Sequence, residues 1–219
     1  MKPVIFCDFD GTITKNDNIV SIMKQFEKEQ TETIIQDVLD KKISIQEGVG
    51  KMFSLLDSEK KDEIIQYLET NAEIREGFDD FISFVKEQNI PFYVVSGGID
   101  FFVEPLLEGL VEKEAIFCNS ASFQNNHIEI LWPHSCDDLC QNGCGCCKPS
   151  VMRKLATNET FKIVIGDSIT DLEAAKMADF VLARDYLVKK CEEEGIPYKS
   201  FETFYDCLSI LKEELEVRT

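Results

Sequence analysis

The sequence IFCDFDGT, residues 5–12, ends an apolar run with two acids, Asp8 and Asp10, placed two positions apart. The apolar run is rich in branched and aromatic residues, which favours a buried parallel strand. In an open α/β sheet, ligands bind outside the carboxyl ends of the strands, where loops present side chains to a shared crevice. The stretch therefore predicts the first strand of such a sheet and two side chains of a ligand site.

Four later runs have the same character and also predict buried strands: FYVVS (92–96), AIFCN (115–119), KIVIG (162–166) and DFVLA (179–183). Helical patterns precede several of them, as in FDDFISFVKEQN (78–89), SVMRKLAT (150–157) and DLEAAKMA (171–178). This alternation of strand and helix predicts an α/β fold with a doubly wound parallel sheet. A turn signal at Asn125 and Asn126 predicts a small hairpin within 122–133.

One segment, from Thr14 to Ile74, breaks the alternation. It has no convincing strand, and its apolar residues recur three and four apart, which indicates several amphipathic helices. We therefore expect a small α-helical cap, residues 14–74, inserted after the first strand. Residues 1–13 and 75–219 would then form the core domain.

Composition narrows the possible partners. The chain has 219 residues, and 41 acidic against 23 basic residues give a formal charge of −18, which disfavours nucleic acid and anionic membranes. No stretch approaches the ~20 apolar residues that a membrane span requires, and the first residues carry no secretory signal. Nine cysteines, an odd number, indicate a reducing compartment. We expect a soluble cytoplasmic protein that binds small molecules or proteins, in an oligomeric state that the sequence leaves open.

Further polar motifs follow predicted strands or open a helix. SGG (96–98) follows FYVV, GDSITD (166–171) follows KIVI, and Lys148 opens a helix between them. Each motif alone is an ordinary turn or a solvated lysine. Their order, D-x-D-G-T, S-G-G, K and G-D-x-x-x-D, each at the end of a predicted element, indicates one shared site.

These motifs resemble those of the haloacid dehalogenase (HAD) superfamily, over nearly the whole chain. The helical insert directly after the first motif resembles the cap of the phosphoserine-phosphatase-like branch, and within it the chain is most similar to phosphatases of methionine salvage. The resemblance implies a Rossmann-like core and a Mg²⁺-dependent phosphatase acting on a small acyclic phosphate ester. Phosphoserine or another small phosphomonoester is the alternative substrate.

The resemblance also assigns roles to individual residues. Asp8 would attack phosphorus, Asp10 would act as acid and then base, and Lys148 would add positive charge. Oxygen ligands suit Mg²⁺, and the resemblance implies metal contacts or support from Asp8, Asp10 (through its backbone carbonyl), Asp167 and Asp171. It places the phosphoryl group against Thr12, Ser96, Gly97 and Gly98.

The cap is expected to set specificity. Residues 14–74 contain no arginine, which argues against the carboxylate of phosphoserine, although Lys51 could substitute. Met52 and Phe53 would suit a methylthio tail through sulfur and aromatic contacts, or they are simply helix core.

A cysteine-rich run, CDDLCQNGCGCCK (136–148), precedes the proposed lysine. Its five cysteines could form a zinc site, with or without His134, but the spacing is not the usual paired C-x-x-C pattern. A reduced loop at the entrance, with His134 exposed, is the preferred interpretation, and Cys7 is expected in the core. A zinc or redox sensor on an inactive HAD scaffold is the alternative of another class.

Overall fold

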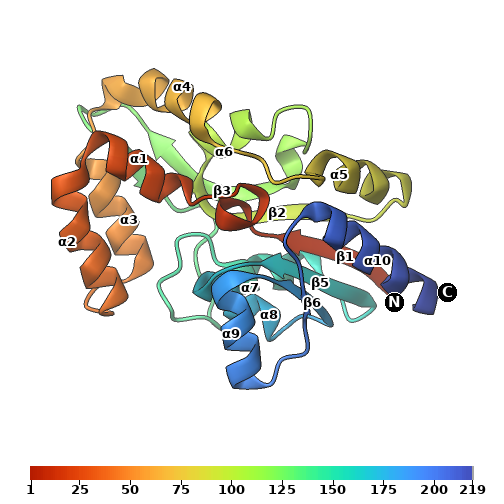
Figure 1. Cartoon of the computed structure of the whole chain (residues 1–219). Coiled ribbons are helices and arrows are strands. Elements are labelled where there is room, and N and C mark those ends of the chain that lie inside the picture. Colours follow the sequence, from red (N-terminus) through yellow and green to blue (C-terminus); the bar gives the residue numbers. More distant parts are fainter. Residues whose placement is uncertain (219) are drawn as a thin grey trace.

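The structure is a computed structural model that describes residues 1–218. The described residues form one seven-stranded sheet, in the order β4-β3-β2-β1-β5-β6-β7, with helices on both faces (Figure 1). Neighbouring strands are parallel except β3 and β4, which are antiparallel. The strands are β1 (Lys2–Cys7), β2 (Phe92–Ile99), β3 (Ile116–Ser122), β4 (Glu129–Leu131), β5 (Thr160–Gly166), β6 (Phe180–Ala183) and β7 (Lys199–Ser200). The predicted doubly wound α/β fold is confirmed.

Helices cover the sheet in two layers. The helices that follow the insert are α5 (Phe78–Glu87), α6 (Asp100–Leu106), α7 (Lys148–Leu155), α8 (Leu172–Ala175), α9 (Asp185–Glu194) and α10 (Phe204–Arg218). In Figure 1, α5, α6 and α10 lie above the sheet, and α7, α8 and α9 lie below it.

The first strand is buried on both faces. Ile5 lies in the main hydrophobic core with Phe81 of α5, whereas Phe6 lies in a second core with Val151 and Met152 of α7. Alternate side chains of a strand point to opposite faces, so a strand between two helical layers must be apolar at nearly every position. This explains why the run before Asp8 is continuously apolar.

Between β1 and β2 the chain forms four helices, which lie together at the left and top of Figure 1: α1 (Asn18–Phe26), α2 (Lys28–Leu39), α3 (Ile45–Ser54) and α4 (Lys61–Asn71). The two ends of this segment meet, because Thr14 and Ile74 form an isolated β-bridge and Lys15 N–H donates to the Glu73 carbonyl at 2.9 Å. The helices were predicted from the sequence. Their division from the core as a cap domain stays an interpretation.

Other local predictions match the structure with small differences. The predicted hairpin is β3–β4, and the predicted strands are β2, β3, β5 and β6. The helix expected over 171–178 is shorter, because a 3-10 turn (Ile169–Asp171) precedes the four residues of α8. None of the helices within residues 1–218 is both long and apolar enough to cross a membrane.

Candidate active site

Three carboxylates meet where the strand order reverses. Asp8 directly follows β1 and Asp167 directly follows β5, and these two strands are parallel neighbours. From this point the chain runs to β2 and β3 on one side and to β6 and β7 on the other, and such switch points are where open α/β sheets bind ligands. One oxygen each of Asp8, Asp167 and Asp171 lies within 4.8 Å of the others. The structure therefore brings these three predicted residues together.

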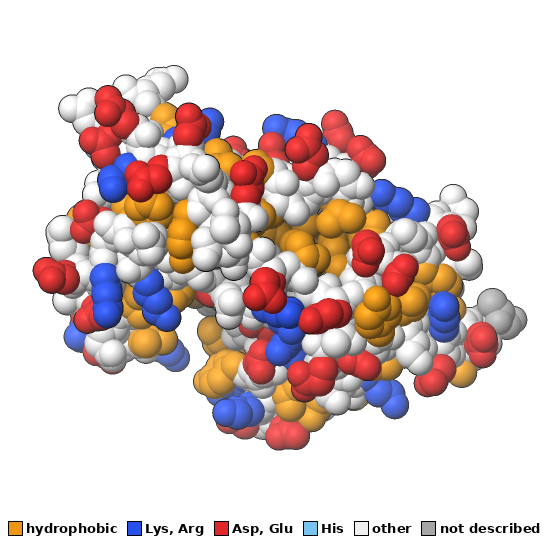
Figure 2. Space-filling view, turned by 45° about the horizontal axis from the view of Figure 1, so that its top comes forward, with side chains coloured by type: hydrophobic (Ala, Val, Ile, Leu, Met, Phe, Trp, Pro, Cys, Tyr) orange, Lys and Arg blue, Asp and Glu red, His pale blue; other side chains and the backbone are white. Residues whose placement is uncertain are grey.

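The site lies between the sheet and the insert. The carboxyl end of β1 points toward the insert in Figure 1, and Figure 2 shows the surface hollowed between the insert and the part of the core that carries α7 to α9.

Lys148, the first residue of α7, neutralises part of the carboxylate cluster. Its Nζ lies 2.6 Å from Asp8 Oδ2 and also forms an ion pair with Asp171 Oδ1. Burial alone would lower the pKa of Lys148, but the charges of Asp171 and Asp8 reverse this effect and raise it. The lysine is therefore a fixed cation against the carboxylate of Asp8.

One lysine does not balance three acids. Burial, and then the charge of Asp171, raises the pKa of Asp8 well above its usual value and that of Asp167 to about 7. Burial and the like charge of Asp171 both disfavour the ionised carboxylates, which a further positive charge would stabilise. An all-oxygen donor set with excess negative charge fits a hard divalent cation such as Mg²⁺.

Asp171 orients its neighbours. Its Oδ2 accepts hydrogen bonds from the N–H groups of Asp167 (3.1 Å) and Ser168 (3.0 Å), while its Oδ1 pairs with Lys148. It is 1% exposed. Asp171 thus fixes both the loop after β5 and the position of the lysine.

Asp10 stands apart from this cluster. Its Oδ1 accepts hydrogen bonds from the backbone N–H (2.9 Å) and from Nδ2 (2.7 Å) of Asn18, the first residue of α1. Burial, and then the charge of Asp17, raises the pKa of Asp10 to about 7. A Cβ on Gly98 would lie 3.0 Å from Asp10 Oδ2, so a glycine there leaves room for this carboxyl. A pKa near neutrality suits a group that first gives and then takes a proton.

Two residues of the first motif position Asp167: Gly11 leaves space for its carboxylate and Thr12 binds it. Gly11 has φ +79°, and a Cβ on it would lie 2.5 Å from Asp167 Oδ2, so no other residue fits without a shift of the loop. Thr12 Oγ1 donates to Asp167 Oδ1 at 2.7 Å. The Thr12 hydroxyl, predicted to contact substrate, is here bound to a carboxylate of the cluster.

The segment Ser96–Gly98, expected to follow the second strand, lies within β2 where its pairing with β3 is irregular, and it offers groups for an anion. Ser96 is fully buried and its Oγ accepts the N–H of Gly98 at 2.9 Å, which leaves the hydroxyl hydrogen available to donate. Gly97 is exposed, and a Cβ on it would have nothing within 4 Å. The backbone at Gly97 is therefore open to close approach by a ligand.

Asn119 of β3 supports this segment of β2 and was missed by the sequence analysis. Its Nδ2 donates to the Gly97 carbonyl at 2.8 Å, and the residue is 1% exposed. Its Oδ1 finds no hydrogen-bond partner within the described part of the chain. Nothing in the run AIFCN marks this asparagine, because its contact is with another strand.

Arg75 was also missed. It is 6% exposed, and its guanidinium donates to the backbone carbonyls of Thr12 (2.8 Å), Gly11 (2.7 Å) and Glu202 (3.3 Å). Its backbone N–H donates to Ile13 O at 2.8 Å. Arg75 thus holds the motif loop directly after the insert returns to the core.

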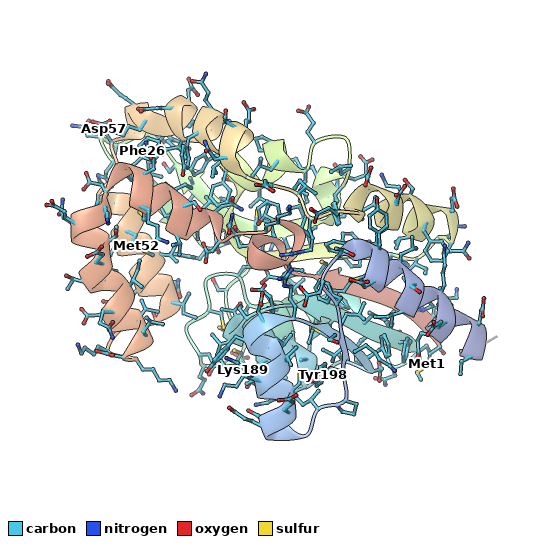
Figure 3. All side chains as sticks on the ribbon, in the orientation of Figure 1. Met1, Phe26, Met52, Asp57, Lys189 and Tyr198 are labelled. Atoms are coloured by element: carbon cyan, nitrogen blue, oxygen red, sulfur yellow. The ribbon has the colours of Figure 1, made fainter. Side chains whose placement is uncertain are left out.

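Met52 and Phe53 of α3 lie in the packed interior. They are 6% and 0% exposed, and Phe53 makes an edge-to-face contact with Phe101 of α6 at a centroid distance of 6.2 Å. Figure 3 labels Met52 on the insert. Lys51 is exposed and pairs with Glu47 at 2.7 Å. The substrate contacts expected of Met52 and Phe53 stay a prediction.

The prediction for Cys7 is confirmed and that for His134 is not. Cys7 is 1% exposed in the main core, as expected. His134 is partly buried against the Phe117 ring, at a centroid distance of 5.2 Å, so the expectation that it is exposed is wrong. The His134 side chain does not belong to the group of thiols formed by Cys136, Cys140, Cys144 and Cys147.

Known proteins similar to this chain agree on one kind of chemistry. A family model described as haloacid dehalogenase-like hydrolase matches residues 5–176. A protein of Geobacillus thermodenitrificans (strain NG80-2) is 59% identical over 214 residues, 98% of this chain and 97% of its own length, and is named 2-hydroxy-3-keto-5-methylthiopentenyl-1-phosphate phosphatase. A protein of Bacillus pumilus (strain SAFR-032) with the same name is 56% identical over 217 residues, 99% of this chain and 94% of its own.

Solved structures share the fold. A substrate-bound phosphoserine phosphatase complex has a TM-score of 0.66 at 22% identity and covers 87% of this chain and 90% of its own. A phospho-aspartyl intermediate analogue of phosphoserine phosphatase has a TM-score of 0.65 at 23% identity, with 86% and 90% covered.

Proposed function

The chain belongs to the haloacid dehalogenase-like hydrolases, and we propose that it is a phosphatase that hydrolyses 2-hydroxy-3-keto-5-methylthiopentenyl-1-phosphate with Mg²⁺ as cofactor. The observation that carries the proposal is the cluster of Asp8, Asp167 and Asp171 around Lys148 at the switch point of the sheet. Relatives that are 56–59% identical over nearly the whole chain bear the name of this activity. The motif acids are all present, which argues against a sensor on an inactive scaffold.

Asp8 is the nucleophile of the proposed reaction. Its carboxylate attacks phosphorus, forms an aspartyl-phosphate and displaces the substrate alkoxide, so that one difficult step becomes two easier ones. The Phe9 N–H donates to Asp8 Oδ1 at 2.8 Å and Lys148 binds Oδ2, which fixes the orientation of the carboxylate. Positioning and charge neutralisation dominate phosphoryl transfer, and both are supplied here.

Asp10 transfers the protons in both half-reactions. In its protonated form it donates to the leaving alkoxide, and in its ionised form it accepts a proton from the water that hydrolyses the aspartyl-phosphate. Its pKa of about 7 makes both forms accessible near neutral pH, and Asn18 holds the carboxyl in place.

The oxygens of the phosphoryl group are proposed to be bound by hydrogen-bond donors of β2 and α7. Ser96 Oγ and the N–H of Gly97 are the proposed donors to its oxygens, together with the Lys148 ammonium. Asn119, through the Gly97 carbonyl, keeps this irregular part of β2 in the conformation that presents the Gly97 N–H.

The carboxylates of Asp8 and Asp167 and the backbone carbonyl of Asp10 would hold Mg²⁺, with Asp171 supporting from its hydrogen bonds to the loop after β5. When bound, the ion would neutralise the phosphoryl oxygens and lower the repulsion between the ester and the attacking carboxylate.

The insert, residues 14–74, is proposed to act as a cap that closes over the substrate and excludes water. Met52 and Phe53 are proposed to approach the methylthio tail from α3. On the face drawn in Figure 2, basic side chains are scattered among acidic ones, in keeping with a small phosphate ester rather than nucleic acid or a membrane as the partner. A role in the cytoplasm is part of the same proposal.

The test is phosphate release by the purified chain, with Mg²⁺ or with EDTA, from a panel of esters. The panel contains the methylthiopentenyl phosphate, phosphoserine and simple sugar phosphates. We expect Mg²⁺-dependent release with a strong preference for the first. A preference for phosphoserine would keep the mechanism and reject the substrate, and no metal-dependent release from any ester would reject the phosphatase.

A further inference from the structure

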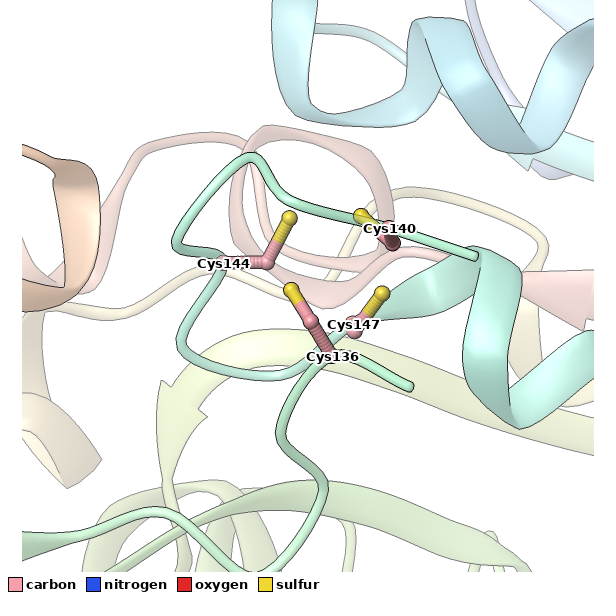
Figure 4. Close-up of side chains that lie close together, drawn as sticks. All are labelled: Cys136, Cys140, Cys144 and Cys147. Atoms are coloured by element: carbon pink, nitrogen blue, oxygen red, sulfur yellow. The ribbon is translucent and has the colours of Figure 1, made fainter. Parts of the chain in front are cut away.

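Four thiols converge in the loop that joins β4 to α7. The Sγ atoms of Cys136, Cys140, Cys144 and Cys147 all lie within 4.8 Å of one another. Figure 4 shows the four side chains pointing toward a common centre from different parts of the loop. Three of them are partly exposed and Cys147 is buried, so the centre lies near the surface. This cluster is separate from the carboxylates of the phosphatase site.

The fifth cysteine of the run points elsewhere. Cys146 is 6% exposed, and its Sγ donates to the Phe117 carbonyl at 3.5 Å. The ligand spacing is therefore C-x3-C-x3-C-x2-C, which differs from two paired C-x-x-C motifs. The loop turns back on itself and so brings the four thiols together despite this spacing. Gly143, directly before Cys144, has the left-handed conformation (φ +62°) that such a turn requires.

We propose that Cys136, Cys140, Cys144 and Cys147 bind one Zn²⁺ ion as a tetrahedral tetrathiolate structural site. Zn–S bonds of about 2.3 Å place the sulfur atoms of such a site about 3.8 Å apart, so thiols already within 4.8 Å need only small side-chain rotations. All four cysteines are free thiols in the structure, as ligation of zinc requires. Thiolate ligands in a closed set of four select zinc over hard cations such as Mg²⁺.

Hydrogen bonds around the cluster hold it in place. Ser150 Oγ donates to Cys147 Sγ at 3.0 Å and accepts the N–H of Asp137 at 3.0 Å. Cys147 N–H donates to the His134 carbonyl at 2.8 Å. Partners of this kind orient metal ligands, and here they act on the first and last parts of the loop.

The position of the site gives it a structural task. Cys147 is the N-cap residue of α7, and the next residue is Lys148, whose ammonium contacts Asp8. On the other side, the Gly143 carbonyl accepts the N–H of Gln46 in α3 at 3.3 Å. A zinc ion would therefore rigidify a loop that joins the proposed phosphate-binding lysine to the helical insert.

The experiment measures metal on the full chain, purified in reducing buffer without added zinc and without chelator. We expect about one Zn²⁺ per chain by elemental analysis. Replacement by Co²⁺ is expected to give the intense visible bands and the near-ultraviolet sulfur-to-metal charge transfer of a tetrahedral thiolate site, which carboxylate ligands do not give.

Two variants within the loop make a matched pair. Cys144→Ser is expected to lose most of the zinc and the cobalt–thiolate absorption. Cys146→Ser, two residues away and outside the cluster, is expected to keep both. A wild-type chain that takes up no zinc from a zinc-supplemented buffer would overturn the proposal, as would iron in place of zinc, disulfides among the four cysteines in the reducing buffer, or equal zinc content in the two variants. None of these results bears on the Mg²⁺-dependent hydrolysis.

Discussion

Lys148 Nζ lies 2.6 Å from Asp8 Oδ2, and the two side chains are only 7% and 6% exposed. Asp8 directly follows the first strand and Lys148 begins α7, so the contact exists only in the folded protein. In a site this buried, each charge is stabilised by the other, because an unpaired buried charge carries a large free-energy cost. The pair therefore links the stability of the core to the reactivity of the nucleophile.

Replacing the nucleophile tests the proposed chemistry most directly. Asp8→Asn keeps the size and the hydrogen-bonding oxygen of the side chain but removes the anionic attack on phosphorus. We expect kcat for Mg²⁺-dependent phosphate release to fall at least roughly 10⁴-fold, as for the loss of other covalent nucleophiles. Circular dichroism and the Tm would serve as the control for the fold. Substantial activity in a normally folded variant would contradict the assignment.

Lys148→Met leaves two buried acids, Asp8 and Asp171, without their cation. We expect the free energy of unfolding of the metal-free protein to fall by roughly 3–5 kcal/mol, and phosphate release to be largely lost. Urea denaturation and an activity assay measure the two effects.

The matched control for that variant is Lys162→Met, which removes a partly exposed ion pair with Asp179 (Nζ to Oδ2, 2.9 Å). This change is expected to cost less than about 1 kcal/mol and to leave kcat nearly unchanged. An equal cost for the two lysines would mean that the pair with Asp8 is not the buried contact described above.

The sequence predicts the acids of the site because their signal is local. Asp8 and Asp167 each follow an apolar strand, and the ends of adjacent parallel strands meet at one edge of the sheet whatever the details of packing. The helices of the insert were predictable for a similar reason, since the period of apolar residues is a local property.

Arg75 and Asn119 could not be predicted in this way. Both bind backbone carbonyls of segments distant in the sequence, and backbone groups leave no trace in the residue types of a sequence. The sequence raised a zinc site among the five cysteines of the run but favoured a reduced loop, because their spacing is not the usual paired pattern and the fold of the loop around Gly143 is not visible in it.

Arg75 is expected to act on the reaction through the motif loop. In Arg75→Lys a single ammonium cannot serve the carbonyls of Gly11 and Thr12 with the fixed fork of a guanidinium. We expect a loss of roughly 1–3 kcal/mol in stability and a fall in kcat with little change in KM, because the acids of the motif would move while Ser96 and Gly97 of β2 would not.

Arg184→Lys is the matched control for Arg75, since Arg184 also donates to the Glu202 carbonyl (3.3 Å) but has no hydrogen bond to the motif loop. It is expected to leave kcat close to the wild-type value. If both variants lowered kcat alike, the effect of Arg75 would come from the region of Glu202 and not from the motif.

Asp167 is expected to reduce stability in the absence of metal. Its pKa is raised from 3.8 to about 7, so between these values the folded state keeps a proton that the unfolded state gives up. The stability of the metal-free protein therefore falls as the pH rises through this window, and the loss is complete above pH 7. We expect Asp167→Asn, without Mg²⁺ and above neutral pH, to gain roughly 1–2 kcal/mol, about 2–8 °C in Tm for a chain of this size.

The same variant should no longer respond to the ion. Mg²⁺ is expected to raise the Tm of the wild-type chain, more above neutral pH than below it, because protons compete with the cation for the carboxylates. Asp167→Asn removes one of the proposed ligands, so its Tm is expected to change little on addition of Mg²⁺. Thermal unfolding on both sides of pH 7, with and without Mg²⁺, measures both effects. If the metal-free variant were less stable than the wild-type chain above neutral pH, the carboxylate of Asp167 would not be destabilised by its neighbours. If Mg²⁺ raised the Tm of the variant as much as that of the wild-type chain, Asp167 would not be a ligand of the ion.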